Sequence, residues 1–232
     1  MTDTCVIGRE EARHLQTVLR VKINDRIQLF DGQGRTREVS ATAADKHGLS
    51  VMAAAAVVEH PRAACHLTLF VCVSKGKRMD WTVEKSVELG VSEIVPVISD
   101  RTIVRVGGDD ADAKADRWMR VAEEAARQCG AAWLPQIHPP TMFNDSLAQV
   151  RSAPPVFVAA FSSDASLLRD AVSACPPPKQ AGWFVGPEGD FTLDELDALL
   201  KAGTIPVSLG RNVLRAETAS LYGLCALNCF WL

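Results

Sequence analysis

Hydrophobic spacing divides the chain into two stretches with different patterns. In the first stretch, residues 10–21 carry apolar side chains at helical spacing, and three short segments of β-forming residues follow: RIQLF, TREVSATA and LSVMAAAAVV. Asp31-Gly32-Gln33-Gly34 lies between the first two segments and is typical of a hairpin turn. The pattern predicts a small β-rich unit, a barrel, over about residues 1–62, with Pro61 at its boundary.

The second stretch alternates apolar strands with amphipathic helices up to the C-terminus. The predicted strands are HLTLFVCV, EIVPVI, VFVAAF, GWFVG and IPVSLG. The predicted helices are MDWTVEKSVELG, DAKADRWMRVAEEAARQC, DASLLRDAVSAC, LDELDALLKAG and AETASLYGLCALNCFWL. Strands that are apolar throughout and separated by helices indicate an α/β unit with a parallel sheet buried on both faces. We expect this unit to cover residues 63–232.

Composition places the chain among globular proteins and weakens one functional class. Hydrophobic residues make up 47% of the 232 residues, and no apolar run approaches the ~20 residues of a membrane span. No secretory signal is visible at the start, so we expect a soluble, cytoplasmic protein without a membrane partner. The net charge of −3 removes the simplest argument for a nucleic-acid partner. The seven cysteines form no CxxC motif and are predicted to be small buried hydrophobes.

Several motifs that would reveal a reaction directly are absent. The sequence has no GxGxxG and no GxxxxGK[ST], which disfavours dinucleotide binding and nucleoside triphosphate chemistry. It has no GxSxG, no HExxH and no cysteine and histidine set with zinc spacing. We therefore expect neither a metal site nor a hydrolase.

Two loops at strand ends are the candidate sites. The first, GPEGDF at 186–191, follows an apolar strand and precedes a helix that Thr192 and Glu195 can cap with a capping box. Its glycines allow the backbone to approach a ligand, and a side chain at Gly186 is expected to occupy ligand space. The second, LGRNVLRAETA at 209–219, brings three charges to the start of the last helix. Taken singly, the first could equally be a tight turn and the second an ordinary helix N-terminus.

Together, the two loops resemble the RsmE-type methyltransferases of the SPOUT superfamily, which modify N3 of a uridine in 16S ribosomal RNA. The resemblance extends over nearly the whole chain through four further segments: HLQTVLRVKIND, FDGQG, KGKRMDWTVEKSVELGVSEIVPVISDRTIV and RWMRVAEEAARQCGAAWLPQI. It implies a PUA-like RNA-binding β-barrel over 1–62. It also implies a SPOUT methyltransferase domain over 63–232, an α/β unit with a deep trefoil knot.

The resemblance further implies a homodimer that binds S-adenosylmethionine in three knot loops. The implied cofactor-binding residues are Ala160, Phe161, Gly186, Pro187, Glu188, Gly189, Leu209, Gly210, Asn212, Val213, Leu214, Thr218 and Ala219. The last predicted helix supports a dimer independently, because it is apolar on more than one face, although a central core helix would also be apolar.

This chain departs from the family pattern at three places. Asp190 stands where the family usually has a second glycine, and Gly130 is followed by Ala131-Ala132 where an arginine is common. The chain also begins later than typical members, which open with an additional strand before the first helix. We therefore expect the N-terminal barrel to lack that strand.

For methyl transfer to uracil N3, the protein must help to remove the N3 proton or stabilise the uracil anion that results. Arg215 is the candidate that stabilises the anion, because a guanidinium offers a fork of donors to a carbonyl oxygen. Glu217 is the candidate general base, or else a helix cap or an ion-pair partner of Arg215.

The expected partner is 16S ribosomal RNA, free or in the small ribosomal subunit, with the target uridine unpaired or flipped out. The candidate RNA-binding residues are Arg20, Lys22, Arg35, Arg37, Lys75, Lys77 and Arg78, each of which could instead be a solvated surface residue. The alternatives are a SPOUT methyltransferase acting on another base or on ribose, a catalytically silent RNA-binding protein, and an unrelated nucleotide-binding α/β protein.

Overall fold

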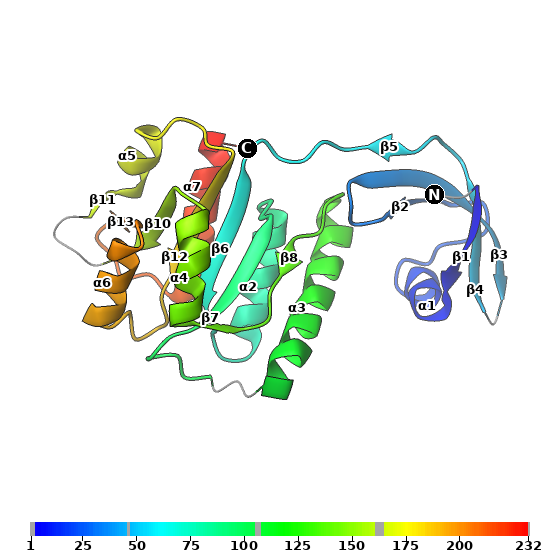
Figure 1. Cartoon of the computed structure of the whole chain (residues 1–232). Helices are drawn as coiled ribbons and strands as arrows, with labels where there is room; N and C mark the ends of the chain where they lie inside the picture. The colour runs from blue at the N-terminus through cyan, green and yellow to red at the C-terminus, as the bar shows by residue number, and fades with distance from the viewer. Residues whose placement is uncertain (1–2, 46, 105–107, 161–164, 232) are drawn as a thin grey trace. The chain divides into compact units, whose positions relative to one another are not determined.

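The computed structural model describes residues 3–45, 47–104, 108–160 and 165–231. They form two compact units, residues 1–62 and residues 63–232 (Figure 1). The boundary lies one residue after Pro61, and each unit has its own sheet.

The first unit is an antiparallel sheet covered by one helix. Its elements are β1 (Thr4–Gly8), α1 (Arg9–Thr17), β2 (Arg26–Phe30), β3 (Arg35–Asp45), β4 (Gly48–Ala53) and β5 (Val58–Glu59). The strand order is β1-β4-β3-β2, with β5 beside β3. The predicted turn between β2 and β3 is confirmed, because the Asp31 side chain accepts hydrogen bonds from the backbone N–H groups of Gln33 and Arg35.

The expectation that the strand before the first helix is missing is wrong. Strand β1 pairs with β4 from Thr4 opposite Met52 to Gly8 opposite Gly48. Its sequence TCVIG is rich in β-branched residues, which is the signal that could have predicted it. Gly48 permits the pairing, because a Cβ at this position would lie 2.0 Å from the Ile7 carbonyl oxygen.

The second unit is the expected α/β unit with a parallel sheet. Its elements are β6 (His66–Cys72), α2 (Lys77–Glu88), β7 (Glu93–Ile98), α3 (Gly108–Cys129), β8 (Gln136–Ile137), β9 (Thr141–Met142), α4 (Phe143–Ser152), β10 (Val156–Ala159), β11 (Ser166–Leu167), α5 (Leu168–Ser173), β12 (Gln180–Val185), α6 (Leu193–Lys201), β13 (Ile205–Ser208) and α7 (Ala216–Trp231). The strand order is β11-β13-β10-β12-β6-β7-β8, with β9 beside β7, and all pairings are parallel.

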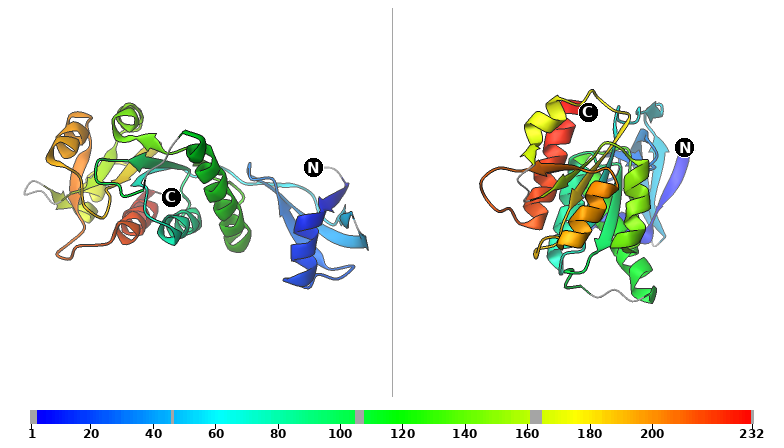
Figure 2. Two further views of the ribbon diagram at one scale, coloured as in Figure 1. Left: turned by 90° about the horizontal axis from the view of Figure 1, so that it is seen from below. Right: turned by 60° about the vertical axis from the view of Figure 1, so that its left-hand side comes forward.

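Helices cover both faces of this sheet (Figure 2). Helices α4 and α6 pack over Phe70, Phe184 and Val158, where the rings of Phe70 and Phe184 stack with centroids 5.4 Å apart. Helices α2 and α7 pack together on the opposite face, and α3 packs on α2. Burial on both faces explains why the strands are apolar throughout.

Helix α7 lies close to the central strand β12 because of one glycine. The Trp183 ring on β12 is fully buried and donates its Nε1–H to the Ala219 carbonyl oxygen at 3.1 Å. A Cβ at Gly223, one turn further along α7, would lie 2.0 Å from that ring. Any side chain at residue 223 would therefore displace α7 or Trp183.

Three details of the second unit differ from the sequence analysis. Helix α4 and strands β8 and β9 are additional, although Phe143, Leu147 and Val150 have the spacing of one helix face. Residues 166–167 form β11 instead of the first turn of a helix, because they pair with β13.

The prediction of buried cysteines is wrong for most of them. Cys65 and Cys72 are buried, Cys175 is half-buried, and the exposed ones are Cys5, Cys129, Cys225 and Cys229. Apolar neighbours misled the prediction, because Cys225 and Cys229 lie four residues apart on the outward face of α7.

Within the described ranges, no helix is both long and apolar enough to cross a membrane.

A half-buried carboxylate links strands β6 and β7 to the residue that follows β8. Glu93 accepts hydrogen bonds from Nε2 of His66 at 3.1 Å, Nε2 of His138 at 2.5 Å and the Thr68 hydroxyl at 3.1 Å. Burial raises the pKa of Glu93, but the bonds from His66, His138 and Thr68 outweigh burial and lower it below its usual value.

Because the pKa of Glu93 is lowered on folding, the carboxylate stabilises the fold above the unfolded-state pKa and loses this effect as pH falls through the folded-state pKa. We predict that Glu93→Gln lowers the free energy of unfolding by about 1–2 kcal/mol at pH 7. The difference from the wild type should shrink below about pH 4.3. Urea denaturation across pH measures it, with Glu124→Gln on exposed α3 as the control; a pH-independent difference would contradict the prediction.

Candidate active site

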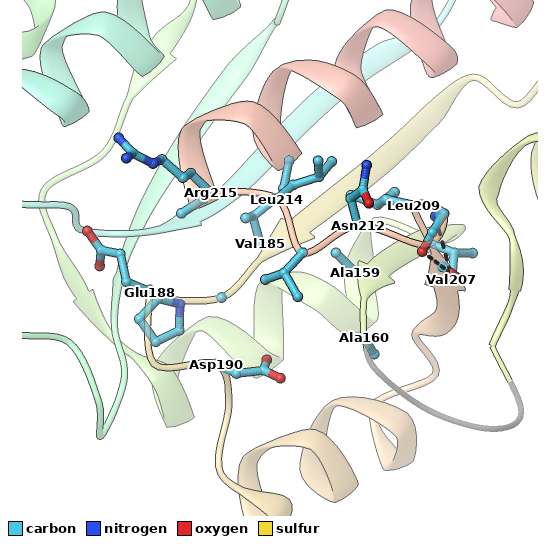
Figure 3. Close-up of a pocket in the computed structure, with 17 residues that line it drawn as sticks. Ala159, Ala160, Val185, Glu188, Asp190, Val207, Leu209, Asn212, Leu214 and Arg215 are labelled. Carbon is cyan, nitrogen blue, oxygen red and sulfur yellow. Dashed lines mark hydrogen bonds between the residues drawn. The ribbon is translucent and has the colours of Figure 1, made fainter.

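A cavity of about 280 Å³ lies at the carboxyl ends of three adjacent parallel strands. Strand β10 stands between β12 and β13, so the loops that follow these strands meet at one edge of the sheet. Ligands in open α/β sheets bind at such an edge. Figure 3 shows the side chains that line the cavity.

Most of the residues implied as cofactor-binding line this cavity. They are Ala160, Gly186, Pro187, Glu188, Leu209, Gly210, Asn212, Val213, Leu214 and Ala219. Gly189 and Thr218 are not among the lining residues, and Phe161 lies outside the described residues. The sequence analysis missed the lining residues Ala159, Val185, Asp190, Val207, Ser208 and Ala216. The last residues of strands that lead into such loops were the available signal.

The walls are mainly apolar, with a minority of polar surface. Val185, Val207 and Leu214 contribute alkyl surface from two strands and the last loop. Gly210 has φ of +112°, a conformation that favours glycine and bends the chain at the start of that loop. Such a lining suits a flat, largely apolar ligand held by a few polar groups.

The loop after β12 is held in place by two arginines from other segments. Arg78, at the start of α2, donates from Nη1 to Oε1 of Glu188 at 2.9 Å. Arg101, after β7, donates from Nη1 to the carbonyl oxygens of Gly189 at 2.7 Å and Phe191 at 3.3 Å. Arg101 was missed in the sequence analysis, although ISDRT follows a strand that ends at the same edge of the sheet.

The helix that follows this loop anchors it from the other side. The predicted capping box of Thr192 and Glu195 is confirmed at the start of α6. Glu195 is 5% exposed, and its second carboxylate oxygen accepts the Asp100 N–H at 2.9 Å. The capping residue thus also joins the loop after β7 to the loop after β12.

The reason expected for Gly186 is corrected by the structure. A Cβ at this residue would lie 3.0 Å from the Phe191 ring, so the missing side chain leaves room for Phe191 beneath the loop. Phe191 is buried against Phe143 and Phe184. A substitution at Gly186 would therefore disturb packing as well as the cavity.

The two candidate catalytic residues occupy different places. Arg215 lines the cavity and lies near Glu188 at one end, with Asn212 and Leu209 toward the other (Figure 3). Glu217 is not among the lining residues, and its Oε2 atom is buried without a hydrogen-bond partner in the described part of the chain. The structure records no ion pair between Arg215 and Glu217 in that part either.

The candidate RNA-binding residues differ in how free their charges are. Arg20, Lys22, Lys75 and Lys77 are exposed. Arg37 is largely buried and donates to Asp3 and to the Ala55 carbonyl oxygen.

Arg35 and Arg78 also have acidic partners within the chain. Arg35 pairs with Asp31 at 2.6 Å and Arg78 with Glu188. Desolvation raises the pKa of Asp31, but hydrogen bonds from the backbone of Arg35 and Gln33 and from the Arg35 guanidinium outweigh it and lower the pKa to about 2. The carboxylate therefore remains charged beside Arg35 at neutral pH.

In the same described ranges, no group of three or more His, Cys, Asp or Glu side chains is arranged to hold a metal ion.

Comparison with known proteins gives concordant results for both units. Residues 61–228 match a family described as an RNA methyltransferase domain, and residues 7–51 match an RNA methyltransferase PUA domain. Ribosomal RNA small subunit methyltransferase E of Bacillus subtilis is 26% identical over 97% of this chain and 90% of its own length. The Rickettsia conorii protein of the same name is 29% identical over 90% of this chain and 82% of its own length.

A solved structure shows the same likeness over the whole chain. Ribosomal RNA small subunit methyltransferase E of Neisseria gonorrhoeae, bound to S-adenosylmethionine, is 30% identical to this chain. It superposes with a TM-score of 0.84 over 100% of this chain and 94% of that protein.

We predict that Arg101 supports ligand binding by holding the loop after β12 in place. Because Arg101→Met keeps the alkyl stem but leaves the Gly189 carbonyl without its charged donor, we expect the loop to loosen and ligand affinity to fall about five- to tenfold. Calorimetry with S-adenosylhomocysteine measures the affinity. Arg120→Met on the exposed side of α3 is the matched control. Equal affinities in Arg101→Met and the wild type would show that the loop keeps its shape without this residue.

Proposed function

This chain belongs to the ribosomal RNA small subunit methyltransferase E family, and from that premise we propose that it transfers a methyl group from S-adenosylmethionine to N3 of a uridine in 16S ribosomal RNA. The observation that carries the proposal is the cavity at the ends of β10, β12 and β13, with Arg215 in its lining. An RNA methyltransferase needs a cofactor pocket that also opens toward a nucleobase, and this cavity has both apolar walls and a charged end.

The residues of the cavity fit S-adenosylmethionine. Val185, Val207 and Leu214 offer apolar surface to an adenine ring, and the backbone of 186–188 and 212–214 can hold its polar edge. When bound, the cofactor supplies a methyl group activated by a sulfonium centre. The work left to the chain is to align the two reactants, to exclude water and to manage the N3 proton.

Arg215 is assigned to the uracil anion that forms when N3 loses its proton. The negative charge spreads over the two carbonyl oxygens beside N3, and a guanidinium can donate to such an oxygen. Arg215 lines the cavity and has no ion-pair partner among the residues that the structure describes, which leaves its donors available for a substrate.

Glu217 is the candidate general base, with less support than Arg215 has for its role. Its buried Oε2 atom lacks a hydrogen-bond partner in the described residues, and a buried unpaired carboxylate oxygen is costly. A donor from the substrate or from a second subunit would satisfy it. Its place in the first turn of α7 also fits a purely electrostatic role at the helix N-terminus.

The N-terminal unit is assigned to RNA binding as a PUA-like barrel. Its antiparallel sheet and the match over residues 7–51 support this assignment. Among the candidate RNA contacts, the exposed Arg20, Lys22, Lys75 and Lys77 have the freest charges. A flipped uridine would be recognised through phosphates and RNA shape more than through duplex sequence.

We further propose a trefoil knot in the second unit, a homodimer and a cytoplasmic location. Residues of the segment 209–215 line one cavity with Ala160 after β10 and with the loop after β12, and this closeness of three chain segments supports a trefoil knot. The outward face of α7 exposes Tyr222 and Phe230, which supports a homodimer through this helix. A ribosomal RNA substrate supports a cytoplasmic location.

One experiment tests the proposed reaction and separates Arg215 from Glu217. Small ribosomal subunits from cells that lack the protein are incubated with the purified protein and labelled S-adenosylmethionine. Their 16S ribosomal RNA is then mapped by mass spectrometry. We expect one N3-methylated uridine and a fall in rate of about 10²-fold or more for Arg215→Ala, with unchanged cofactor binding. Arg215→Lys should restore the methylation rate only in part, because lysine lacks the planar fork of donors. If Glu217 is the base, Glu217→Gln should recover activity as pH rises and uracil deprotonates unaided.

Arg211→Ala is the matched control, because Arg211 is exposed in the same loop and does not line the cavity. Full activity of Arg215→Ala would remove this residue from catalysis. A wild-type pH profile in Glu217→Gln would make that carboxylate structural. Absence of any methylated uridine would overturn the proposed reaction.

Two exposed lysines give the RNA prediction: Lys75, two residues before α2, and Lys77, the first residue of α2. If Lys75 and Lys77 contact phosphates, changing both to glutamine should weaken RNA binding and lower the salt slope by roughly 0.7–0.9 per lost contact. Filter binding between low and moderate salt measures the slope. Lys179→Gln is the control, since Lys179 precedes β12 at the opposite edge of the sheet. An unchanged slope would make both lysines ordinary surface residues.

A further inference from the structure

Asp190 contributes a negative charge to the cavity that has no ion-pair partner among the described residues. Among the described residues, three charged side chains line the cavity: Glu188, Asp190 and Arg215. Glu188 is neutralised by Arg78, whereas Asp190 uses only Oδ1, which accepts the Phe191 N–H at 2.8 Å. In Figure 3 the Asp190 carboxylate is directed toward the end of β10 near Ala160, away from Arg215. The net charge at this part of the cavity is therefore negative.

The backbone conformation of Asp190 is one that glycine adopts more easily than aspartate. Asp190 closes a turn by donating its N–H to the Pro187 carbonyl oxygen at 2.9 Å, with φ of +61°. Glycine adopts this left-handed conformation without steric cost, and it is the residue that the family motif usually has here. A carboxylate has thus replaced the residue that the backbone would accept most easily.

We propose that Asp190 makes this enzyme prefer the positively charged S-adenosylmethionine to its neutral product S-adenosylhomocysteine. The inference rests on the proposed function. In the reaction the bond between sulfur and the methyl carbon breaks with its electrons remaining on sulfur, a bond from N3 to that carbon forms, and the N3 proton passes to a base or to solvent. Asp190 therefore faces a ligand that loses one positive charge, and the attraction ends when the methyl group has been transferred.

The size and lining of the cavity make this attraction effective. A cavity of about 280 Å³ keeps every ligand atom within roughly one Debye length of the carboxylate, so salt screens the interaction only in part. Apolar walls such as Val185 and Val207 lower the local dielectric constant and strengthen it. Selective loss of attraction for the product would assist its release.

A purely structural role for Asp190 makes a different prediction. If the side chain only accepts the Phe191 N–H, asparagine can replace it, because its amide oxygen accepts the same bond and asparagine tolerates positive φ. Asp190→Asn therefore removes the charge while it preserves shape and turn. Asp190→Gly removes both the charge and the conformational strain.

The test compares ligand affinities by calorimetry, without any turnover. We expect Asp190→Asn and Asp190→Gly to weaken binding of S-adenosylmethionine about tenfold and to leave S-adenosylhomocysteine within about twofold. The wild-type preference should shrink at high salt. Asp194→Asn is the matched control, because Asp194 is an exposed acid in the first turn of α6 that does not line this cavity.

Two results would overturn the inference while the proposed function stands. Unchanged affinities for both ligands in Asp190→Asn would show that the charge of Asp190 does not affect ligand binding. An equal loss for both ligands would show that Asp190 shapes the loop only. If the wild type binds neither compound, the proposed function itself fails, and the inference fails with it.

Discussion

The position of β10 between β12 and β13 is the constraint on which the site depends. Parallel strands place their carboxyl ends at one edge, and this strand order brings three loops from residues 160, 186 and 209 onward to the same place. Ala160 at the end of β10 and residues of the loops after β12 and β13 line the cavity.

Long-range contacts then fix the shape of the most important loop. Glycines give the segment 186–191 freedom, and other parts of the chain remove it: Arg78 holds Glu188, Arg101 holds two carbonyl oxygens, and Asp100 binds the capping residue Glu195. Phe191 fills the space that Gly186 leaves beneath the loop. The loop is therefore pre-organised by the segments after β6 and β7 as well as by its own sequence.

The sequence was sufficient for the parts of the fold that depend on local pattern. Apolar strands and the capping box at Thr192 could be predicted, because periodicity and motif spacing are local signals. Most lining residues of the cavity were implied by the family resemblance alone. Asp190 could be noticed but not interpreted, since only the fold shows that its carboxylate lines the cavity. Arg101 and Arg78 could not be assigned to the loop, because their partners lie 88 and 110 residues away. The outward side of α7, with its exposed cysteines, was likewise hidden by an apolar composition.

The charges of the cavity suit the two reactants of the proposed reaction. Arg215 at one end would meet a uracil that has lost its proton, and Asp190 would meet a sulfonium cation. A carboxylate that stabilises a cation in the ground state strengthens binding, but it does not lower the barrier to a step that removes that cation. In the proposed reaction Arg215 would differ, because it would stabilise a charge that neutral uracil lacks and that must form before the methyl group can move. The two side chains would thus divide the work: Asp190 would govern which ligand stays bound, and Arg215 would govern how readily the nitrogen becomes a nucleophile.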